Sequence, residues 1–306
     1  SGEHKGETVE TTQEINPMYA LQPKEIKIGS KIIISPMALN EMEEEEWIFI
    51  EYNRSDILIW FVAVFLALVI VLGKRKGVST IISLILTILA VFAVFIPSIL
   101  SGYNIYVSTI IICIFIIFMN LIIINGLNKK TACAIIGNIG GVAIAGLIAV
   151  IMNKLLNITG IIDEEYVFLM SAQFEKPINL IALIWSGIVL GSLGAIMDVA
   201  MSIASAMNEL AENMEEKTFS NMMRSGMNIG RDAIGTMTNT LILAYVGSSL
   251  ATVLLLIAYN KDILYLFNME MIVVEVLQSV VGSIGILFAV PVTSLFSAYI
   301  FNRKSV

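Results

Sequence analysis

The sequence predicts an all-α polytopic membrane bundle of about seven transmembrane helices, preceded by a small N-terminal extracytoplasmic segment that contains β-strands. Three observations lead to this fold class. Of the 306 residues, 57% are hydrophobic and only 14% are charged, whereas a soluble domain is about 25% charged. Apolar runs long enough to cross a bilayer, which takes about 20 residues, recur from residue 57 onward. The basic residues between these runs fall mainly in alternate loops.

Residues 1–56 form a segment of different composition. They hold 12 acids and five bases, whereas residues 57–306 hold 13 of each. The stretches GETVE and EIKIGSKIIIS alternate β-branched and polar residues, which predicts short strands. We expect the acidic run Glu43–Glu46 to be a solvated connection to the first span. A segment of fewer than about 60 residues buries little core, so it is either a small β module or part of a larger one.

The rest of the chain, 57–306, is predicted to be one transmembrane domain of seven helices. The long connection 207–235 is expected to be a cytoplasmic segment whose first part continues the fifth helix. The first two spans almost lack polar residues, which is typical of lipid-exposed helices. The predicted spans are 57–73, 79–100, 106–125, 131–152, 178–206, 236–258 and 272–301.

The loops predict the orientation. Ten bases follow the odd-numbered spans, and only three follow the even-numbered ones. By the positive-inside rule, the N-terminal segment lies outside and the C-terminus lies in the cytoplasm. The first group is Lys74, Arg75, Lys76, Lys129, Lys130, Lys217, Arg224, Arg231, Arg303 and Lys304, and the second is Lys154, Lys176 and Lys261.

The fifth span carries a narrow stripe of small and polar residues on an otherwise apolar helix. An ionisable group such as Asp198 costs about 2.5–3.5 kcal/mol inside a membrane on insertion scales, so it should face protein or water. Two interpretations stay open: a packing seam with one hydrogen-bonded acid, and a proton or cation site on a permeation path. At 100° per residue the stripe contains Gly187, Gly191, Gly194, Asp198, Ser202, Ser205 and Glu209.

Two later segments show similar faces. On a helix, Asn228, Asp232, Gly235 and Asn239 share one side, with Arg224, Arg231 and Thr238 beside it. Gly226 and Gly230 form a GxxxG pattern, and Gly230 with Gly235 is expected to allow a break at the membrane entry. The arginines are expected to touch lipid phosphates, and Arg231 is a candidate partner for Asp198. In the seventh span the aligned residues are Glu275, Ser279, Gly282, Ala289, Thr293 and Ser297.

These three faces together are predicted to line one cavity. The fourth span also holds Gly137, Asn138, Gly140, Gly141 and Gly146, which favour a closely packed helix.

Several function classes find little support in the sequence. The single histidine, His4, lies near the N-terminus, and Cys113 and Cys133 fall in apolar runs, so no metal site and no cofactor are expected. No nucleophile elbow, P-loop or HExxH motif is present. We therefore expect no enzyme, with an intramembrane pair of Asp198 and Asp232 as the less favoured alternative. The formal charge of −7 argues against nucleic-acid binding.

The later half of the chain resembles the YibE/F family of bacterial multi-pass membrane proteins. The resemblance rests on GSLGAIMDVAMSIASAMNEL, RSGMNIGRDAIGTMTNTLILAYVGSSL and VVGSIGILFAVPVTSLFSAYIF, with GKRKGVSTIISLILTILAVFAVFIPSILSGYNIYV and GLNKKTACAIIGNIGGVAIAGL before them. It covers about residues 57–301. It implies a location in the bacterial plasma membrane, a permease-like character and an N-terminal anchor before the β segment. GEHKGETVE and IKIGSKIII resemble the end of that segment, so an upstream anchor is expected to be missing here.

The preferred hypothesis is transport of a small solute or ion through a cavity lined by the later helices. Its alternative is a non-catalytic membrane scaffold or assembly partner that packs through glycine seams. The expected partners are the lipid bilayer and either a second copy or another membrane protein, in a homo-oligomer or hetero-oligomer. The polar path would contain Asp198, Ser202, Asn228, Arg231, Asp232 and Asn239, and the packing residues are Gly187, Gly191, Gly194, Gly226, Gly230 and Gly282.

Overall fold

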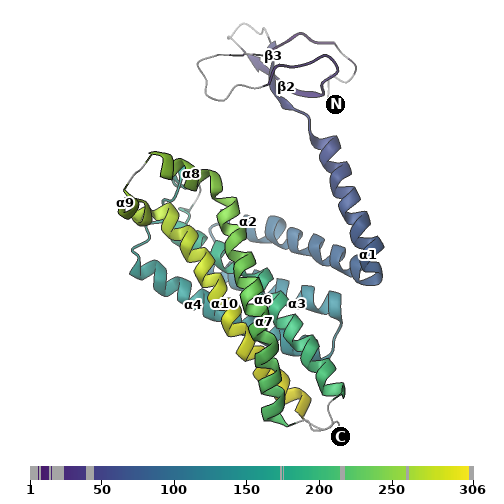
Figure 1. Cartoon of the computed structure of the whole chain (residues 1–306). Helices are drawn as coiled ribbons and strands as arrows, with labels where there is room; N and C mark the ends of the chain where they lie inside the picture. Colours follow the sequence, from purple (N-terminus) through teal and green to yellow (C-terminus); the bar gives the residue numbers. More distant parts are fainter. Residues whose placement is uncertain are drawn as a thin grey trace. The chain divides into compact units, whose positions relative to one another are not determined.

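The computed structural model divides into two compact units, Ser1–Lys74 and Arg75–Val306. Figure 1 labels their helices and strands along the chain. Each unit is described below by itself. The residues described are 6, 8–13, 15, 24–38, 45–172, 174, 176–213, 218–259 and 262–302.

The first unit contains a three-stranded sheet of order β1-β3-β2. The central strand β3, Glu45–Tyr52, pairs antiparallel with β2, Ile32–Ala38, and parallel with the two-residue β1, Thr11–Thr12. The expected connection Glu43–Glu46 is corrected, because Glu45 and Glu46 open β3, while Glu43 and Glu44 lie outside the described residues. The aromatic and β-branched run WIFIEY that follows has high strand propensity, which outweighs the two glutamates.

The predicted strands are confirmed only in part. The stretch IKIGSKIII leads into β2, but the described residues of GETVE are not in a strand, and β1 begins just after it. In this unit, none of the residues whose exposure the structure describes is buried. Side chains instead tie the segment before β2 to the sheet: Gln13 Nε2 donates to the Lys24 carbonyl at 3.0 Å, and the Tyr52 hydroxyl donates to it at 2.6 Å.

A long apolar helical stretch begins at the end of β3. It consists of α1, Ser55–Leu89, a π-helix over Ala90–Phe95, and α2, Ile96–Leu100. The predicted loop between the first two spans is corrected to a break at one residue, Lys74, with φ 51° and ψ −129°. The Ile96 N–H reaches back five residues to the Val91 carbonyl. This π spacing fits the next residue, Pro97, which has no N–H to offer.

Four further helices agree with predicted spans within a few residues. They are α3, Ile105–Asn125, α4, Lys129–Leu155, α6, Leu180–Asn213, and α10, Glu270–Asn302. Asparagine side chains cap three of them, and Asn179 Oδ1 accepts from the Ala182 N–H at 3.0 Å at the start of α6. Asn104 Oδ1 accepts from the Val107 N–H at 3.3 Å, and Asn128 Oδ1 accepts from the Thr131 N–H at 2.9 Å. A short helix, α5, Glu164–Ser171, lies between α4 and α6.

The predicted sixth span, 236–258, differs from the structure. Helix α7 already begins at Phe219, behind the capping hydroxyl of Thr218, and runs to Ser248 without a break at Gly230 or Gly235. The chain breaks instead at Ser249, and α8, Leu250–Tyr259, leaves at 62° to α7. Much of the expected inner segment 207–235 is therefore helix, because α6 extends to Asn213 and α7 covers the part from Phe219. The short α9, Ile263–Asn268, precedes α10.

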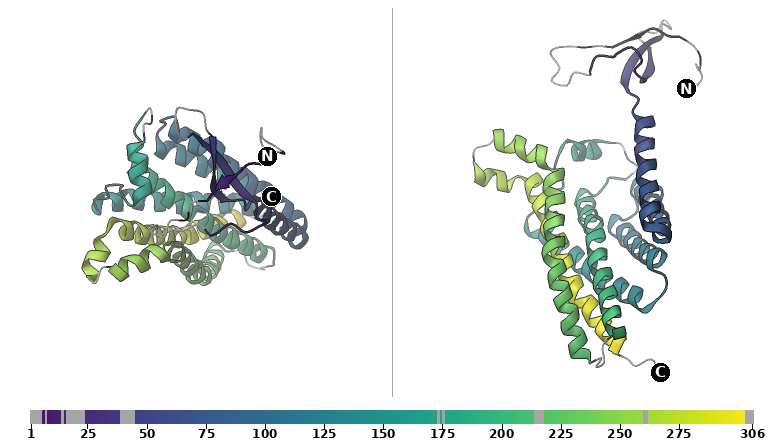
Figure 2. Two further views of the ribbon diagram at one scale, coloured as in Figure 1. Left: turned by 90° about the horizontal axis from the view of Figure 1, so that it is seen from above. Right: turned by 45° about the vertical axis from the view of Figure 1, so that its right-hand side comes forward.

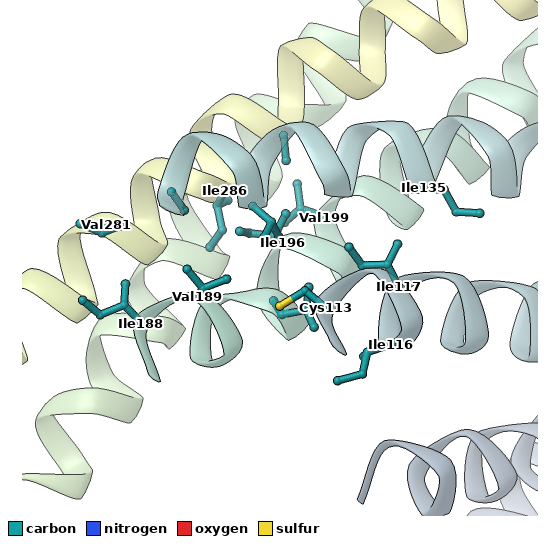
Figure 3. Close-up of a cluster of buried hydrophobic side chains, with 14 of the residues drawn as sticks. Cys113, Ile116, Ile117, Ile135, Ile188, Val189, Ile196, Val199, Val281 and Ile286 are labelled. Atoms are coloured by element: carbon teal, nitrogen blue, oxygen red, sulfur yellow. The ribbon is translucent and has the colours of Figure 1, made fainter. Parts of the chain in front are cut away.

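The hydrophobic core of the second unit lies among α3, α4, α6, α7 and α10. Helices α6, α7 and α10 run side by side in both views of Figure 2. Figure 3 shows buried side chains of α3, α6 and α10 lying together, among them Ile117, Ile196, Val199 and Ile286. In contrast, most side chains of α1 are exposed, and only Gly77 and Ser83 of this helix are buried. The expected lipid-exposed character of the first spans agrees with this pattern.

Among the described residues, five helices are long and apolar enough to cross a membrane, or six if the bent pair of α7 and α8 counts as one span. The stretch Ser55–Leu100 counts here as one helix of 46 residues. The structure therefore shows a multi-pass helical protein, and the count of seven stays a prediction.

Candidate functional site

Helix α6 has one buried face and one exposed face. Its large apolar side chains, such as Ile188, Ile196 and Ile203, are buried against neighbouring helices. The predicted stripe lies on the other side, and its members Gly187, Gly191, Gly194, Asp198 and Ser202 are all exposed. Of the two interpretations left open by the sequence, a packing seam within one chain is not what the structure shows, because these five residues lie on its outer surface.

The three stripe glycines have few close neighbours. A Cβ built on Gly191 would lie 2.5 Å from the Tyr245 hydroxyl of α7, and one on Gly187 would lie 3.9 Å from Gln278 Nε2 of α10. A Cβ on Gly194 would meet nothing within 4 Å. The stripe thus borders α10 at Gly187 and α7 at Gly191, and it is open at Gly194, next to Asp198.

The Asp198 carboxylate has no hydrogen-bond or ion-pair partner in the part of the chain that the structure describes. The expected pair with Arg231 does not form. Arg231 lies on the exposed side of α7 and reaches Asn228 Oδ1 on its own helix at 3.5 Å. No hydrogen bond joins Asp198 to Asp232 among these residues either, so the structure offers no carboxylate dyad.

Helix α7 also divides into two faces. Its buried side holds Gly226 and Gly230, which lie against α10 at Ser294 and Val290. Its opposite side is exposed and carries the predicted polar residues, namely Asn228, Arg231, Asp232 and Asn239.

The polar face of α10 points the other way. Ser279, Gly282, Thr293 and Ser297 are buried among the helices. A Cβ on Gly282 would lie 2.8 Å from Leu241 of α7 and 3.3 Å from Ser192 of α6. The three polar faces therefore do not line one cavity, because the face of α10 is packed inward while those of α6 and α7 face outward.

The structure singles out two buried polar residues that were not among the predicted path residues. Asn138 of α4 and Ser294 of α10 are both 0% exposed. Within the described part of the chain, neither amide atom of Asn138 has a hydrogen-bond partner, and neither does the Ser294 hydroxyl. The signal for Asn138 was present in the stretch GNIGG, but its glycines were read as a packing pattern. No sequence signal pointed to Ser294, because it is not one of the aligned small and polar residues of α10.

An apolar pocket of about 380 Å³ lies among α3, α4 and α6. Its lining includes Cys113, Ile117, Val142, Trp185 and Val189. The Trp185 indole N–H donates to the Gly146 carbonyl at 2.8 Å at its edge. None of the six predicted path residues lines this pocket.

A second pocket, of about 770 Å³, lies in the first unit at the start of α1. Its bases are partly neutralised: Lys31 pairs with Asp56, and Arg54 pairs with Glu51 at 3.2 Å. The hydrogen bond and charge of Asp56 raise the pKa of Lys31. The Tyr52 backbone N–H, and then the charge of Arg54, lower the pKa of Glu51.

Metal ligands are not gathered anywhere in the described ranges, where no group of three or more His, Cys, Asp or Glu side chains is close enough to hold an ion. Both cysteines are buried free thiols.

Comparison with known proteins gives one result. A family model described as YibE/F-like protein matches residues 61–303. No curated protein and no solved structure matches the chain.

Proposed function

The chain belongs to the YibE/F-like family, and from this premise we propose that it is a permease-like protein of the bacterial plasma membrane that moves a small solute or ion. The proposed path runs along the exposed polar faces of α6 and α7. Asp198 would bind a proton or cation, and Ser202, Asn228, Arg231, Asp232 and Asn239 would provide polar contacts along the route. The proposal involves no catalysis and no cofactor.

One observation carries this proposal: Asp198 lies on an exposed face near the middle of a 34-residue apolar helix. A carboxylate that faces hydrocarbon is costly, so such residues normally face water or other protein. No side chain of the described chain pairs with Asp198, and Gly194 leaves the space next to it open. A water-filled path along this face would solvate the carboxylate.

We further propose seven spans with the N-terminal segment outside. A helix of 46 residues at 1.5 Å per residue is about 69 Å long, more than twice the hydrocarbon thickness of about 30 Å. The break at Lys74 supports two crossings, since Lys74, Arg75 and Lys76 would then lie at the cytoplasmic surface.

Cysteine accessibility tests the path. The full chain would carry Asp198→Cys or Ser202→Cys with Cys113 and Cys133 replaced, and a membrane-impermeant thiol reagent would be added to sealed vesicles. Phe288→Cys is the matched control, because Phe288 is also exposed and lies one turn from Gly285, which meets Ile196 of α6. Its neighbours on α10, Ile284, Leu287 and Val292, are apolar. We expect labelling at 198 and 202 and none at 288. If 198 and 202 stay as unreactive as 288, the aqueous path is wrong.

The open space at Gly194 also supports the second candidate, a scaffold whose α6 face packs on another membrane protein or a second copy. Small residues let membrane helices approach closely. In that case Gly194→Leu would reduce the assembly size measured by chemical crosslinking in membranes and would leave the unfolding temperature of the single chain unchanged. An unchanged crosslinking pattern would argue against the scaffold.

A further inference from the structure

The interior of the second unit contains polar groups that its own side chains do not satisfy. Asn138 leaves both Oδ1 and Nδ2 unpartnered, and Ser294 leaves its Oγ unpartnered, although both residues are 0% exposed. An unpaired buried amide or hydroxyl costs roughly 1–3 kcal/mol by protein mutational data. Native structures satisfy most such groups, with protein or with ordered water.

The two helices that carry these groups, α4 and α10, pack against each other. We call this part of them the α4–α10 seam and define it by Cys133, Gly137, Asn138, Thr293, Ser294 and Ser297. The helices run antiparallel and very close together. A Cβ on Gly137 would overlap Thr293 Oγ1, and the Ser297 hydroxyl lies beside the Cys133 thiol one turn away. Asn138 follows Gly137 directly, so it lies at the same level of α4, about 100° around the helix from the glycine.

Ser294 extends the seam toward two other helices. A Cβ on Gly226 of α7 would lie 2.7 Å from Ser294 Oγ and 2.5 Å from the Met207 sulfur of α6. Met207 is itself completely buried. Four helices thus surround a short polar stretch, and Met207 and Cys133 provide one sulfur atom near each end of it.

The chemistry of the seam points to a neutral ligand that both donates and accepts. Its polar side chains carry no charge. A cation would satisfy Asn138 Oδ1 but not the Nδ2 hydrogens, and an anion would do the reverse. Water satisfies both, and buried waters typically make about three hydrogen bonds to groups left without protein partners. We propose that the α4–α10 seam is an internal water-binding site, with Asn138 as its main ligand.

The site is distinct from the exposed faces of α6 and α7, and it does not depend on whether the protein transports a solute. The proposed water site would hydrate the contact between α4 and α10 at a position where glycines bring the two backbones together.

Radiolytic hydroxyl-radical labelling tests this proposal on the full chain in lipid nanodiscs. An X-ray pulse makes radicals from bound water, and these oxidise sulfur next to it even where bulk solvent is excluded. The two cysteines form a matched pair: both are buried and free, but Cys133 lies in the seam and Cys113 lines the apolar pocket. Mass spectrometry should show several-fold more oxidation at Cys133 and Met207 than at Cys113. Equal, low oxidation at all three would mean a dry seam and would overturn the proposal.

The variant Asn138→Leu removes both hydrogen-bonding atoms at similar volume. It should lower oxidation at Cys133 to the level of Cys113 and leave Cys113 unchanged. If Asn138→Leu does not fold, Ser294→Ala provides the second test and should lower oxidation at Met207. Oxidation that is unchanged in a folded variant would remove the mutated residue from the site and refute the proposal as stated.

Discussion

Gly141 offers a sharp test of how closely α4 and α10 pack. A Cβ added there would lie 2.8 Å from the Gly285 carbonyl oxygen, 2.8 Å from Ile196 Cγ2 and 3.0 Å from Ala289 Cβ. The first neighbour is backbone, so it cannot rotate away. The substitution Gly141→Ala therefore has to push the helices apart.

The size of the effect follows from these distances. Carbon atoms pack best at about 3.5–4.0 Å, so α10 or α6 must move by roughly 0.5–1 Å. Overpacking of this kind costs about 1–3 kcal/mol, against a gain in helix propensity of up to about 1 kcal/mol for replacing glycine by alanine. Because one of the close neighbours is backbone, the cost should lie in the upper part of this range, at about 2–3 kcal/mol, which leaves a net loss of about 1–2 kcal/mol. At about 2–4 °C per kcal/mol for a domain of this size, the unfolding temperature falls by about 2–8 °C.

The buried thiols Cys113 and Cys133 make the assay direct, because a thiol-reactive dye fluoresces only after unfolding exposes them. The matched control is Gly194→Ala on α6, where a Cβ meets nothing within 4 Å. It should leave the unfolding temperature unchanged or raise it slightly. The reasoning fails if Gly141→Ala unfolds at or above the wild-type temperature, as Gly194→Ala does.

Two further predictions concern regions outside the proposed path. Glu270 at the start of α10 accepts hydrogen bonds from the N–H groups of Thr159 and Gly160, at 2.9 and 2.7 Å, and from the Thr159 hydroxyl at 2.8 Å. Glu270→Ala should therefore cost about 1–3 kcal/mol and speed protease cleavage near residue 159, whereas Glu164→Ala, without such bonds, should not. In the first unit, the Lys31–Asp56 pair raises the pKa of Lys31, so its stabilisation is present below the ordinary value of 10.5 and is lost as the pH rises through the raised value. Glu51 behaves oppositely: its pKa is lowered, so its contribution is present above the ordinary value of 4.5 and is lost as the pH falls through the lowered value. NMR titration should show the Lys31 pKa returning toward 10.5 in Asp56→Asn, and no change there would contradict the pairing.

Apolar runs predicted the long helices well, because each run is much longer than a β-strand usually is. The ends of α3 and α4 also follow local rules, since Asn104 and Asn128 cap them within their own sequence neighbourhood. The predicted break near Gly230 was wrong, and the break at Ser249 was missed, because the role of Gly230 depends on packing with a distant helix. Gly230 looks like a hinge in the sequence, but in the structure it is the place where Val290 of α10 packs.

The candidate site was harder to predict than the fold. Periodicity placed Asp198, Gly191 and Gly194 correctly on one side of a helix, yet it carries no information about which side faces the neighbours. That choice depends on the whole set of helices, and the large Ile and Val side chains of α6 occupy the inner side. Asn138 was underrated for a similar reason: a lone asparagine among glycines does not reveal that its amide lacks a partner until α10 is in place.

The central position of α10 has a consequence for biogenesis. Each of the helices α4, α6 and α7 has its most extensive helix contact with α10. Yet α10 emerges from the ribosome after all of them. Until it inserts, the surfaces of α4, α6 and α7 that pack against α10, including Gly137 and Gly140 of α4, have no neighbour in the nascent chain. The half-made protein should therefore depend on the insertion machinery or on membrane chaperones to shield them, and a chain truncated before Glu270 should be an efficient substrate for membrane proteases.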